Sequence, residues 1–295
     1  MKAMILAAGL GTRLRPLTDT RPKALVEVAG RTLLEITLTR LSSFGARDLI
    51  INVHHFPEMI LDYLKAHKNF GLHIEISREE QLLDTGGGLK KASWFFLQDS
   101  AEKDEPFILH NVDVISTIDL RRMLEVHNEK QALATLAVQH RQSSRQLLFD
   151  ADLCLCGRRA APNQPPELVR GNLTNALREA TAQSLASPAE GTIPIRLDGE
   201  GTASAVPKSV SNAGALAPQG PLQPFAFSGI HIISSRLLRL LEEQGTFSII
   251  DAYLRLSAAG ERILAFPVDD AHWRDLGKPA DLAQATKDLK PGVLS

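Results

Sequence analysis

Met4-Ile5-Leu6-Ala7-Ala8-Gly9-Leu10-Gly11-Thr12-Arg13 is the stretch that decides the fold. Its apolar first half predicts a short buried strand, and Gly9 and Gly11 predict a turn directly after that strand. Arg13 follows the turn, and Lys23 comes a little later, behind a proline that stiffens its loop. A glycine turn alone is more often structural than functional. Here, backbone N–H groups, a guanidinium fork and a lysine charge together predict a phosphate site.

Two common phosphate-binding motifs do not fit this turn. A dinucleotide fingerprint needs a glycine or alanine where Leu14 stands, which argues against a nicotinamide dehydrogenase. A Walker A loop needs Gly-Lys followed by Ser or Thr, and no such run follows the turn. The kind of phosphate chemistry must therefore be identified from other segments.

Composition and charge narrow the class of protein. The chain has 295 residues, 44% of them apolar, which is enough for one large domain with a sizeable core. Its 33 lysines and arginines nearly balance its 34 aspartates and glutamates, so neither nucleic acid nor a membrane is expected as a partner. Cys154 and Cys156 lie too close in sequence to close a useful disulfide loop. We expect a reduced, cytoplasmic protein, either a monomer or a homodimer.

Strand-like and helix-like segments alternate through the first half of the chain. Apolar runs predict strands over residues 3–8, 48–53, 72–77, 106–109 and 132–139. Helical spacing of apolar residues predicts helices over residues 33–44, 57–67, 88–97 and 120–128. This alternation predicts an α/β fold: a Rossmann-like mixed, mostly parallel sheet with helices on both faces.

The composition changes near residue 158. Residues 158–224 are rich in Ala, Pro, Gly, Ser, Asn and Gln, which predicts a loop-rich insertion with one candidate helix over 172–186. Regular elements resume afterwards, with strands predicted over 225–234 and 263–267 and helices over 237–243, 248–259 and 280–290. We expect residues 1–295 to form a single domain that carries 158–224 as an insertion.

Three predicted strands end in polar residues at one edge of the sheet. Parallel strands present their carboxyl ends at the same edge, where such folds bind ligands. This edge would hold residues 9–13, His54, His55 and residues 111–113. Asp113 follows an apolar strand, where an aspartate is as often a cap as a ligand. The histidines have no third metal ligand at usable spacing, so we expect a loop or supporting role for them.

Residues 9–18 and 22–23 resemble the signature of the sugar-phosphate nucleotidyltransferases. The family pattern is G-x-G-T-R-[LM]-x-P-L-T followed by P-K, and this chain matches it throughout. The resemblance implies that an NTP and a sugar 1-phosphate are converted into an NDP-sugar and pyrophosphate. It also implies a nucleotide site held largely by backbone N–H groups, with these residues: Leu6, Ala7, Ala8, Gly9, Gly11, Thr12, Arg13, Lys23, Thr85, Gly86 and Gly87.

Segments beyond the turn are similar to further motifs of the same family. Leu83-Asp84-Thr85-Gly86-Gly87-Gly88 resembles the L-x-T-x-G run whose backbone lies against the base. Residues 227–230 resemble the strand that borders the sugar. The resemblance therefore implies sugar contacts at Asn111 and Gly229.

The metal site is also implied by resemblance. Asn111-Val112-Asp113 is similar to the family's Gly-Asp pair, with Val112 in place of the usual glycine. Residues 273–279 resemble the W-x-D-[IVL]-G-[TK]-P segment. The resemblance implies Mg²⁺ held by Asp113 and Asp275, which suits the preference of Mg²⁺ for one or two carboxylates plus phosphate oxygens. It implies these catalytic residues: Arg13, Lys23 and Asp113.

The sequence leaves the two substrates open. The glycine run and short chain look most like N-acetylmuramate 1-phosphate uridylyltransferases, which implies UTP, an N-acetylmuramate- or hexose-type 1-phosphate and a role in the cell envelope. Mannose 1-phosphate guanylyltransferases, which use GTP, are the nearest alternative, and a non-catalytic nucleotide-sugar sensor on the same fold is another. The family's lysine for the sugar phosphate has no clear counterpart, and the candidates to replace it are Arg158, Arg159 and Lys208.

Overall fold

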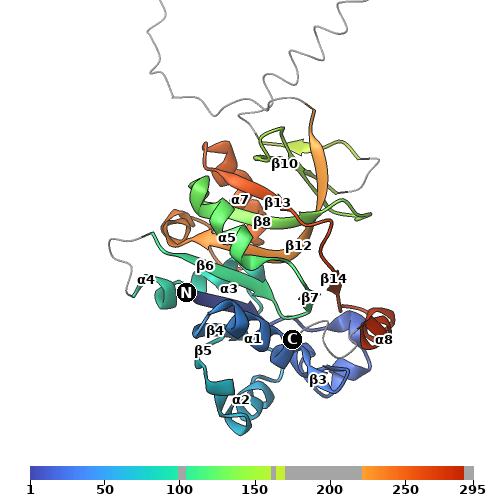
Figure 1. Cartoon of the computed structure of the whole chain (residues 1–295). Helices are drawn as coiled ribbons and strands as arrows, with labels where there is room; N and C mark the ends of the chain where they lie inside the picture. Colours follow the sequence, from blue (N-terminus) through green and yellow to red (C-terminus); the bar gives the residue numbers. More distant parts are fainter. Residues whose placement is uncertain (99–103, 161–163, 170–220, 289–295) are drawn as a thin grey trace, which may run out of the picture.

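The computed structural model confirms the α/β class and the mixed sheet (Figure 1). It describes residues 1–98, 104–160, 164–169 and 221–288. The parallel strands expected from the sequence form a block of four in the order β6-β1-β4-β5. Their bounds are Lys2–Leu6 for β1, Asp48–Val53 for β4, His73–Arg78 for β5 and Pro106–Asn111 for β6.

The long strand β12 (Gln223–Ser234) extends this block from the other side of β6. It runs antiparallel to β6, β8 and β9 and therefore reverses the direction of the sheet. Beyond β6 the pairings are antiparallel, except that β13 lies parallel to β8. These outer strands are β8 (Ala134–Gln139), β9 (Gln146–Phe149), β10 (Leu155–Arg159), β11 (Glu167–Leu168) and β13 (Ile263–Pro267).

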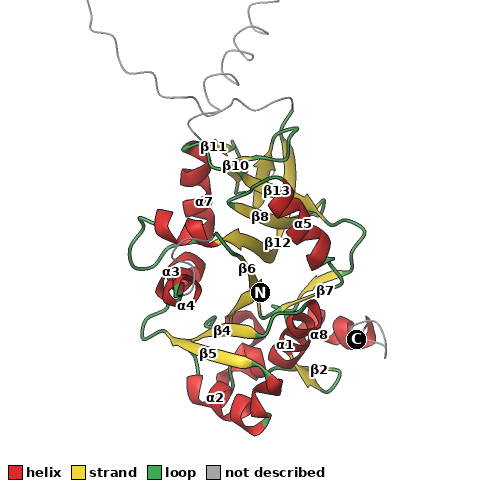
Figure 2. Cartoon of the chain, turned by 60° about the vertical axis from the view of Figure 1, so that its left-hand side comes forward, coloured by secondary structure: helices red, strands yellow, loops and turns green. Residues whose placement is uncertain are grey.

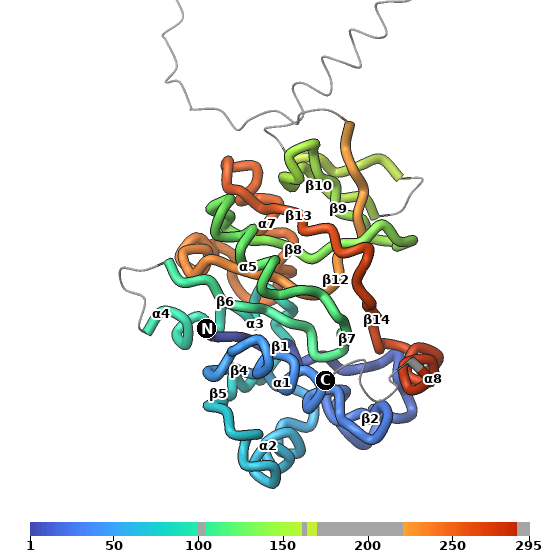
Figure 3. The backbone as a smooth tube through the Cα atoms, viewed as in Figure 1, coloured from blue at the N-terminus to red at the C-terminus, as the bar shows by residue number. Residues whose placement is uncertain are grey.

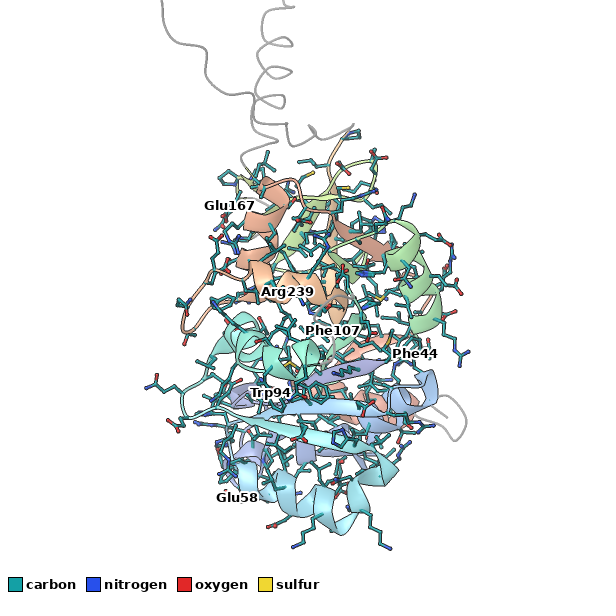
Figure 4. All side chains as sticks on the ribbon, turned by 90° about the vertical axis from the view of Figure 1, so that its left-hand side faces the viewer. Phe44, Glu58, Trp94, Phe107, Glu167 and Arg239 are labelled. Carbon is teal, nitrogen blue, oxygen red and sulfur yellow. The ribbon has the colours of Figure 1, made fainter. Side chains whose placement is uncertain are left out.

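Helices cover both faces of the sheet, as predicted (Figure 2). Alternate residues of one strand point to opposite faces. In β1, Ala3 and Ile5 therefore pack into one core cluster and Met4 into the other. The first cluster lies under α1 (Leu33–Phe44), α2 (Pro57–Ala66) and α5 (Leu120–Glu129), and the second under α3 (Asp84–Lys91), α4 (Ser93–Leu97) and α7 (Ile249–Ala258). Phe107 of β6, labelled in Figure 4, belongs to the second cluster and stacks on Phe96 of α4 with ring centres 3.9 Å apart.

Helix α1 shows why its bounds could be predicted. The Thr32 hydroxyl accepts the Glu35 N–H over 3.0 Å and so caps the first turn. The helix ends at Gly45, whose left-handed backbone (φ 106°) is the conformation that glycine adopts without strain. The predicted range 33–44 is therefore the observed range.

Some predicted elements differ from the structure. The helix expected over 88–97 is two helices, α3 and α4, and α3 begins earlier, at Asp84. The helix expected over 237–243 is wrong, because Ser235–Leu240 forms a 3₁₀ segment. The candidate helix over 172–186 lies outside the described residues.

Several short elements were not predicted. Three 3₁₀ turns, Thr12–Leu14, Leu17–Asp19 and Lys23–Leu25, follow the glycine turn. Two short hairpin strands, β2 (Glu27–Val28) and β3 (Arg31–Thr32), follow them.

A small antiparallel ladder lies beside the main sheet. It joins β7 (Val114–Ser116) to β14 (Trp273–Asp275), and α8 (Pro279–Asp288) follows β14. The tube in Figure 3 shows the green β7 and the red β14 side by side near the blue N-terminal segment. This ladder brings the C-terminal part of the chain to the edge where the parallel strands end.

The two cysteines lie on or next to strand β10. Cys156 is buried in β10, and burial raises the pKa of its thiol to about 12, which fits a packing role. Cys154 is partly exposed, and both thiols are free. None of the described helices has the length and apolar character needed to span a lipid bilayer.

Candidate active site

The carboxyl ends of β1, β4 and β6 open into a pocket of about 430 Å³. The register places these ends side by side, because Leu6 pairs with both Asn52 and Asn111. The pocket therefore lies at the predicted edge of the sheet. Its lining residues are Leu6, Ala7, Ala8, Gly9, Gly11, Thr12, Arg13, Lys23, Asn52, Glu79, Leu82, Asp84, Thr85, Asn111, Val112, Asp113, Thr246 and Gly277.

Gly11 determines the shape of the turn. Its left-handed backbone (φ 66°) suits glycine. A Cβ at this position would lie 2.8 Å from Cγ2 of Thr18 and 3.2 Å from Cβ of Lys23. The Thr18 hydroxyl donates to the Gly11 carbonyl over 2.8 Å. The glycine therefore lets the turn fold back on the following loop, which brings Lys23 to the pocket.

The N–H groups of the turn fall into two sets. The Ala7 N–H donates to Oδ1 of Asn52 over 2.7 Å. It is therefore not available to a nucleotide, contrary to the prediction. The N–H groups of residues 8–11 have no hydrogen-bond partner in the described part of the chain. Those groups are the ones available to phosphate oxygens.

Asn52 and Glu79 form a buried polar pair that lines the pocket, and neither was among the predicted site residues. Each is 3% exposed. Nδ2 of Asn52 donates to Oε1 of Glu79 over 2.7 Å, and the Leu83 N–H donates to Oε2 over 2.9 Å. A satisfied buried network fixes its members firmly, and this one ties β1, β4 and the start of α3 together. The available signal was a polar residue at the end of an apolar strand.

The structure brings together the two cations and two carboxylates that were expected to act together. Nζ of Lys23 contacts Oδ2 of Asp113, and both side chains are largely buried. Nη2 of Arg13 lies 3.6 Å from Oδ2 of Asp275 at a more exposed position. Oδ1 of Asp275 accepts the Gly277 N–H over 2.8 Å. A Cβ on Gly277 would overlap the Arg13 guanidinium, so Arg13 lies directly against this turn.

The β7–β14 ladder explains how two distant aspartates become neighbours. Asp113 and Asp275 are 162 positions apart in the sequence. In the fold, Asp275 pairs with Val114, and the Leu276 N–H donates to the Asp113 carbonyl over 2.8 Å. The segment around Asp275 is therefore a strand and not a capped turn at the start of a helix.

The donor set of Asp113 and Asp275 fits a divalent cation of the Mg²⁺ type. Carboxylate oxygens are its preferred protein ligands, and substrate phosphates and water commonly complete the coordination. Among the described residues there is no group of three or more His, Cys, Asp or Glu side chains suited to a metal. Two carboxylates leave positions for phosphate oxygens, which is what a site shared with a nucleotide requires.

The three glycines of α3 pack against protein, which corrects the role expected for two of them. The N–H groups of Gly86 and Gly87 both donate to the Phe247 carbonyl, over 3.0 and 3.3 Å. A Cβ on Gly86 would overlap the Phe247 ring, and one on Gly87 would overlap the Gly245 carbonyl. Neither residue lines the pocket, whereas the neighbouring Thr85 does. The glycines therefore allow α3 to approach the segment before α7 closely.

The two residues expected at the sugar side lie against each other. Gly229 has a left-handed backbone (φ 76°), and a Cβ there would lie 2.9 Å from Nδ2 of Asn111. Asn111 lines the pocket, and Gly229 packs behind it on β12. Gly229 therefore supports the position of Asn111.

The histidine pair after β4 has protein partners. Nδ1 of His54 lies 2.9 Å from the Glu79 carbonyl, and Nε2 of His55 lies 3.2 Å from the Thr18 carbonyl. Both rings thus hold loops around the pocket, in line with the supporting role that the sequence favoured.

The expected replacements for the sugar-phosphate lysine do not reach the pocket. Nε of Arg158 lies 2.6 Å from Oε2 of Glu167, and its Nη1 contacts Asp251 of α7. Arg159 follows on the same strand, and neither arginine lines the pocket. Lys208 lies outside the described residues.

Comparison with known families agrees with this geometry. Residues 2–147 match the model of the Nucleotidyl transferase family. The matched part of the chain carries the glycine turn, Lys23 and Asp113.

Two curated relatives and one solved structure illustrate the similarity. The chain is 52% identical over 93 residues to an N-acetylmuramate alpha-1-phosphate uridylyltransferase of Caulobacter vibrioides, which covers 30% of this chain and 38% of the relative. It is 36% identical over 137 residues to a mannose-1-phosphate guanyltransferase of Yarrowia lipolytica, which covers 46% of this chain and 37% of the relative. The matches thus span well under half of either relative.

The solved structure shows that the whole fold is shared. A UDP-glucose pyrophosphorylase from Acinetobacter baumanii superposes with a TM-score of 0.66, at 18% identity, over 99% of this chain and 95% of that one. At this identity the likeness concerns the fold alone.

Proposed function

We propose that the protein is a sugar-1-phosphate nucleotidyltransferase, which converts an NTP and a sugar 1-phosphate into an NDP-sugar and pyrophosphate. The observation that carries the proposal is the cluster of Arg13, Lys23 and Asp113, which line the glycine-turn pocket, with Asp275, which pairs with Arg13. The reaction joins two polyanions, so its main requirements are positioning and charge neutralisation. Two cations and two carboxylates beside unpaired N–H groups meet these requirements.

The proposed chemistry needs no protein nucleophile. An oxygen of the sugar phosphate, ionised at neutral pH, attacks the α-phosphorus of the NTP. The new P–O bond forms as the bond to the pyrophosphate oxygen breaks, and pyrophosphate leaves with that electron pair. We place the N–H groups of residues 8–11 and Arg13 at the departing phosphates and Lys23 at the α-phosphate.

Asp113 and Asp275 would hold the divalent cation, which we propose to be Mg²⁺. The ion would supply positive charge to the α-phosphate and the incoming phosphate. Lys23 and Arg13 now face these carboxylates, and a bound NTP offers both cations phosphate oxygens instead.

We propose UTP and an N-acetylmuramate- or hexose-type 1-phosphate as the substrates. The similarity to the uridylyltransferase of Caulobacter vibrioides supports this choice. Glu79 lines the pocket, and its carboxylate oxygens, which already accept from Asn52 and Leu83, keep further lone pairs for the ring N–H of uracil. Guanine offers comparable donors, and the relative from Yarrowia lipolytica supports GTP with mannose 1-phosphate as the alternative.

A substrate grid tests this function. ATP, CTP, GTP and UTP are each combined with N-acetylmuramate 1-phosphate, glucose 1-phosphate and mannose 1-phosphate in Mg²⁺, and pyrophosphate release is measured. We expect release with UTP and an N-acetylmuramate or glucose substrate. Release with GTP and mannose 1-phosphate alone would replace the substrates and keep the reaction. Nucleotide binding without release in any combination would favour the sensor.

We also propose a cytoplasmic location and a role in nucleotide-sugar supply for the cell envelope, because NTPs and sugar phosphates are cytoplasmic metabolites. A single domain over residues 1–295 and a monomeric or homodimeric state stay predictions. Size-exclusion chromatography with light scattering measures the latter directly.

A further inference from the structure

The proposed reaction needs a cation that the pocket residues do not provide. In an in-line transfer, the attacking phosphate and the leaving pyrophosphate lie on opposite sides of the α-phosphorus. Arg13 and Lys23 both come from the glycine turn and its loop, where the NTP phosphates are placed. A second phosphate group therefore requires a positive charge on the far side of the carboxylates.

Arg141, just after β8, lies on that side. Its guanidinium carbon lies 4.0 Å from the centre of the Trp273 ring, and its Nη2 donates to the Phe227 carbonyl over 2.7 Å. Trp273 and Asp275 are alternate residues of β14, so their side chains share one face of the strand. Arg13 contacts the same segment at Gly277. The two arginines therefore meet the segment on either side of Asp275.

The electrostatic environment agrees with this placement. Burial lowers the pKa of Arg141, and the negative charge of Asp275 acts in the opposite direction. Arg141 is only partly buried and stays charged near neutral pH, because the ordinary pKa of arginine is above 12. The carboxylate that we assign to the metal therefore lies within electrostatic reach of a third cation.

Arg141 also has N–H donors without a protein acceptor in the described part of the chain. Of its five N–H groups, one has an acceptor in the described part of the chain, and its Nε is buried without a partner. The residue lines an open hollow of about 770 Å³, together with Gln142, Ser143 and Gln146. The hollow gives a sugar space next to a cation whose fork matches phosphate oxygens.

The other candidate cations are occupied elsewhere. Arg158 pairs with Glu167 and Asp251, and Figure 4 labels Glu167 at the end of the molecule opposite Glu58 of α2. Its two carboxylate partners already neutralise its charge. In the described part of the chain Arg141 forms no ion pair with a carboxylate, and the negative charge of Asp275 raises its pKa.

We propose that Arg141, held over the Trp273 ring, binds the phosphate of the sugar 1-phosphate at the edge of the hollow that Arg141 itself lines. This inference rests on the proposed function and assigns one substrate contact of the same site. The contact with the Trp273 ring and the hydrogen bond to the Phe227 carbonyl restrain the guanidinium, so that less ordering is needed when it binds a phosphate.

The test compares Arg141→Gln and Arg141→Lys with two control variants. Arg145→Gln removes an exposed cation from the same loop, and Arg158→Gln removes the competing candidate. We expect Arg141→Gln to raise the KM for the sugar 1-phosphate about 10- to 100-fold, as for loss of hydrogen bonds to a charged group, with the KM for the NTP unchanged. Arg141→Lys should fall between, because it keeps the charge and loses the fork. The control variants should match the wild type.

A binding measurement separates this inference from the proposed function. Calorimetric titration with glucose 1-phosphate and N-acetylmuramate 1-phosphate, in Mg²⁺ and without NTP, needs no turnover. Weaker binding by Arg141→Gln supports the assignment even if pyrophosphate release fails in every substrate combination. Equal binding and equal KM in wild type and Arg141→Gln, loss in Arg158→Gln instead, or no binding to the wild type would overturn it.

Discussion

Each cation of the pocket forms an ion pair with one of the two carboxylates that we assign to the metal. Lys23 contacts Asp113, and Arg13 lies against Asp275. Without these two ion pairs, each of the four side chains would carry an unpaired charge in a partly buried site, which costs free energy. The site is therefore internally neutral, and in the proposed function an NTP with its cation would exchange these ion pairs for contacts to phosphate. We expect NTP and metal to bind cooperatively for this reason.

The role of Asp113 can be tested by removing its charge alone. Asp113→Asn keeps the shape of the side chain, and we expect pyrophosphate release to fall at least about 100-fold, because a bound metal contributes several kcal/mol to charge stabilisation. Asp152→Asn, at an exposed position between β9 and β10, is the matched control. Circular dichroism should show the same fold for both. Near-normal release by Asp113→Asn would refute the metal assignment.

Asn52 makes a different prediction, because it supports the pocket through other residues. Asn52→Ala leaves the Ala7 N–H and one oxygen of Glu79 without their partner, and we expect a loss of about 1–3 kcal/mol in unfolding free energy. Asn128→Ala, on the exposed side of α5, should change it by less than about 0.5 kcal/mol. Urea unfolding measures both. Equal stabilities would mean that the network does not hold β1 and β4 together.

At the scale of single residues, the sequence predicted those that carry a motif. Arg13, Lys23, Asp113 and Asp275 could be named because a long signature contains them, and the fold places them together. Arg141 could not be named, because its place beside Trp273 depends on a loop and a strand that meet only in the fold.

Helix α3 has a different role from the one predicted from its sequence. Its glycines resemble a nucleotide-binding loop, yet they lie inside a helix and face protein. Glycine costs roughly 0.5–1 kcal/mol relative to alanine in a helix, so the close approach of α3 to Phe247 must offset that cost.

A double-mutant cycle tests this explanation. Gly86→Ala alone should lower the unfolding free energy by about 1–3 kcal/mol, because the new methyl group overlaps the Phe247 ring. In a Phe247→Ala background the same change should cost clearly less, because the ring overlap is gone and only a 3.0 Å contact with the Ile249 backbone nitrogen is left. Urea unfolding of the four proteins gives the coupling. A cost that is the same in both backgrounds would show that the ring is not the reason for the glycine.

The predictability of the elements followed their length and their caps. The strand over 48–53 and the helix over 33–44 were predicted with the observed bounds, since each has a clear period and α1 has a cap and a terminal glycine. Elements of two or three residues, such as β7 and β14, have no period to read. The 3₁₀ segment Ser235–Leu240 has helical spacing of leucines but continues directly from β12, which limits its geometry.

Across the whole molecule, three buried histidines link stability to acidity. Burial lowers the pKa of His110 and His127 to about 4 and that of His231 to about 3. In the unfolded chain these groups titrate near 6.5. Below that pH the unfolded state binds up to three more protons than the folded state, so stability falls as the pH drops from about 6.5 towards 4.

The slope of this loss is measurable. Urea unfolding between pH 7.5 and 5 should show a declining free energy, and His127→Gln should reduce the slope by about one proton. The variant loses ring contacts to Thr135 and Ser234 at every pH, so the slope is the informative quantity and not the absolute stability. An unchanged slope would show that His127 is protonated in the folded state.

At this scale the class of fold and the site edge were predicted, and the antiparallel side of the sheet was not. Alternation of strands and helices predicts parallel order, which holds for β6-β1-β4-β5. The strand β12 reverses the order because it returns to pair with β6 and β8 after the composition change near residue 158. No local pattern in β12 encodes which neighbours it selects.

The β7–β14 ladder determines when, during synthesis, both carboxylates of the site can come together. A ribosome adds roughly 5–20 residues per second, so Asp275 emerges about 8 to 32 s after Asp113. During that interval the glycine turn, Lys23 and most of the parallel block can already be in place. The growing chain would then offer an NTP a cradle with one carboxylate, and a nucleotide bound there could not yet be consumed. In the proposed function, pairing of β14 with β7 would thus be the assembly step that brings the second carboxylate to the site.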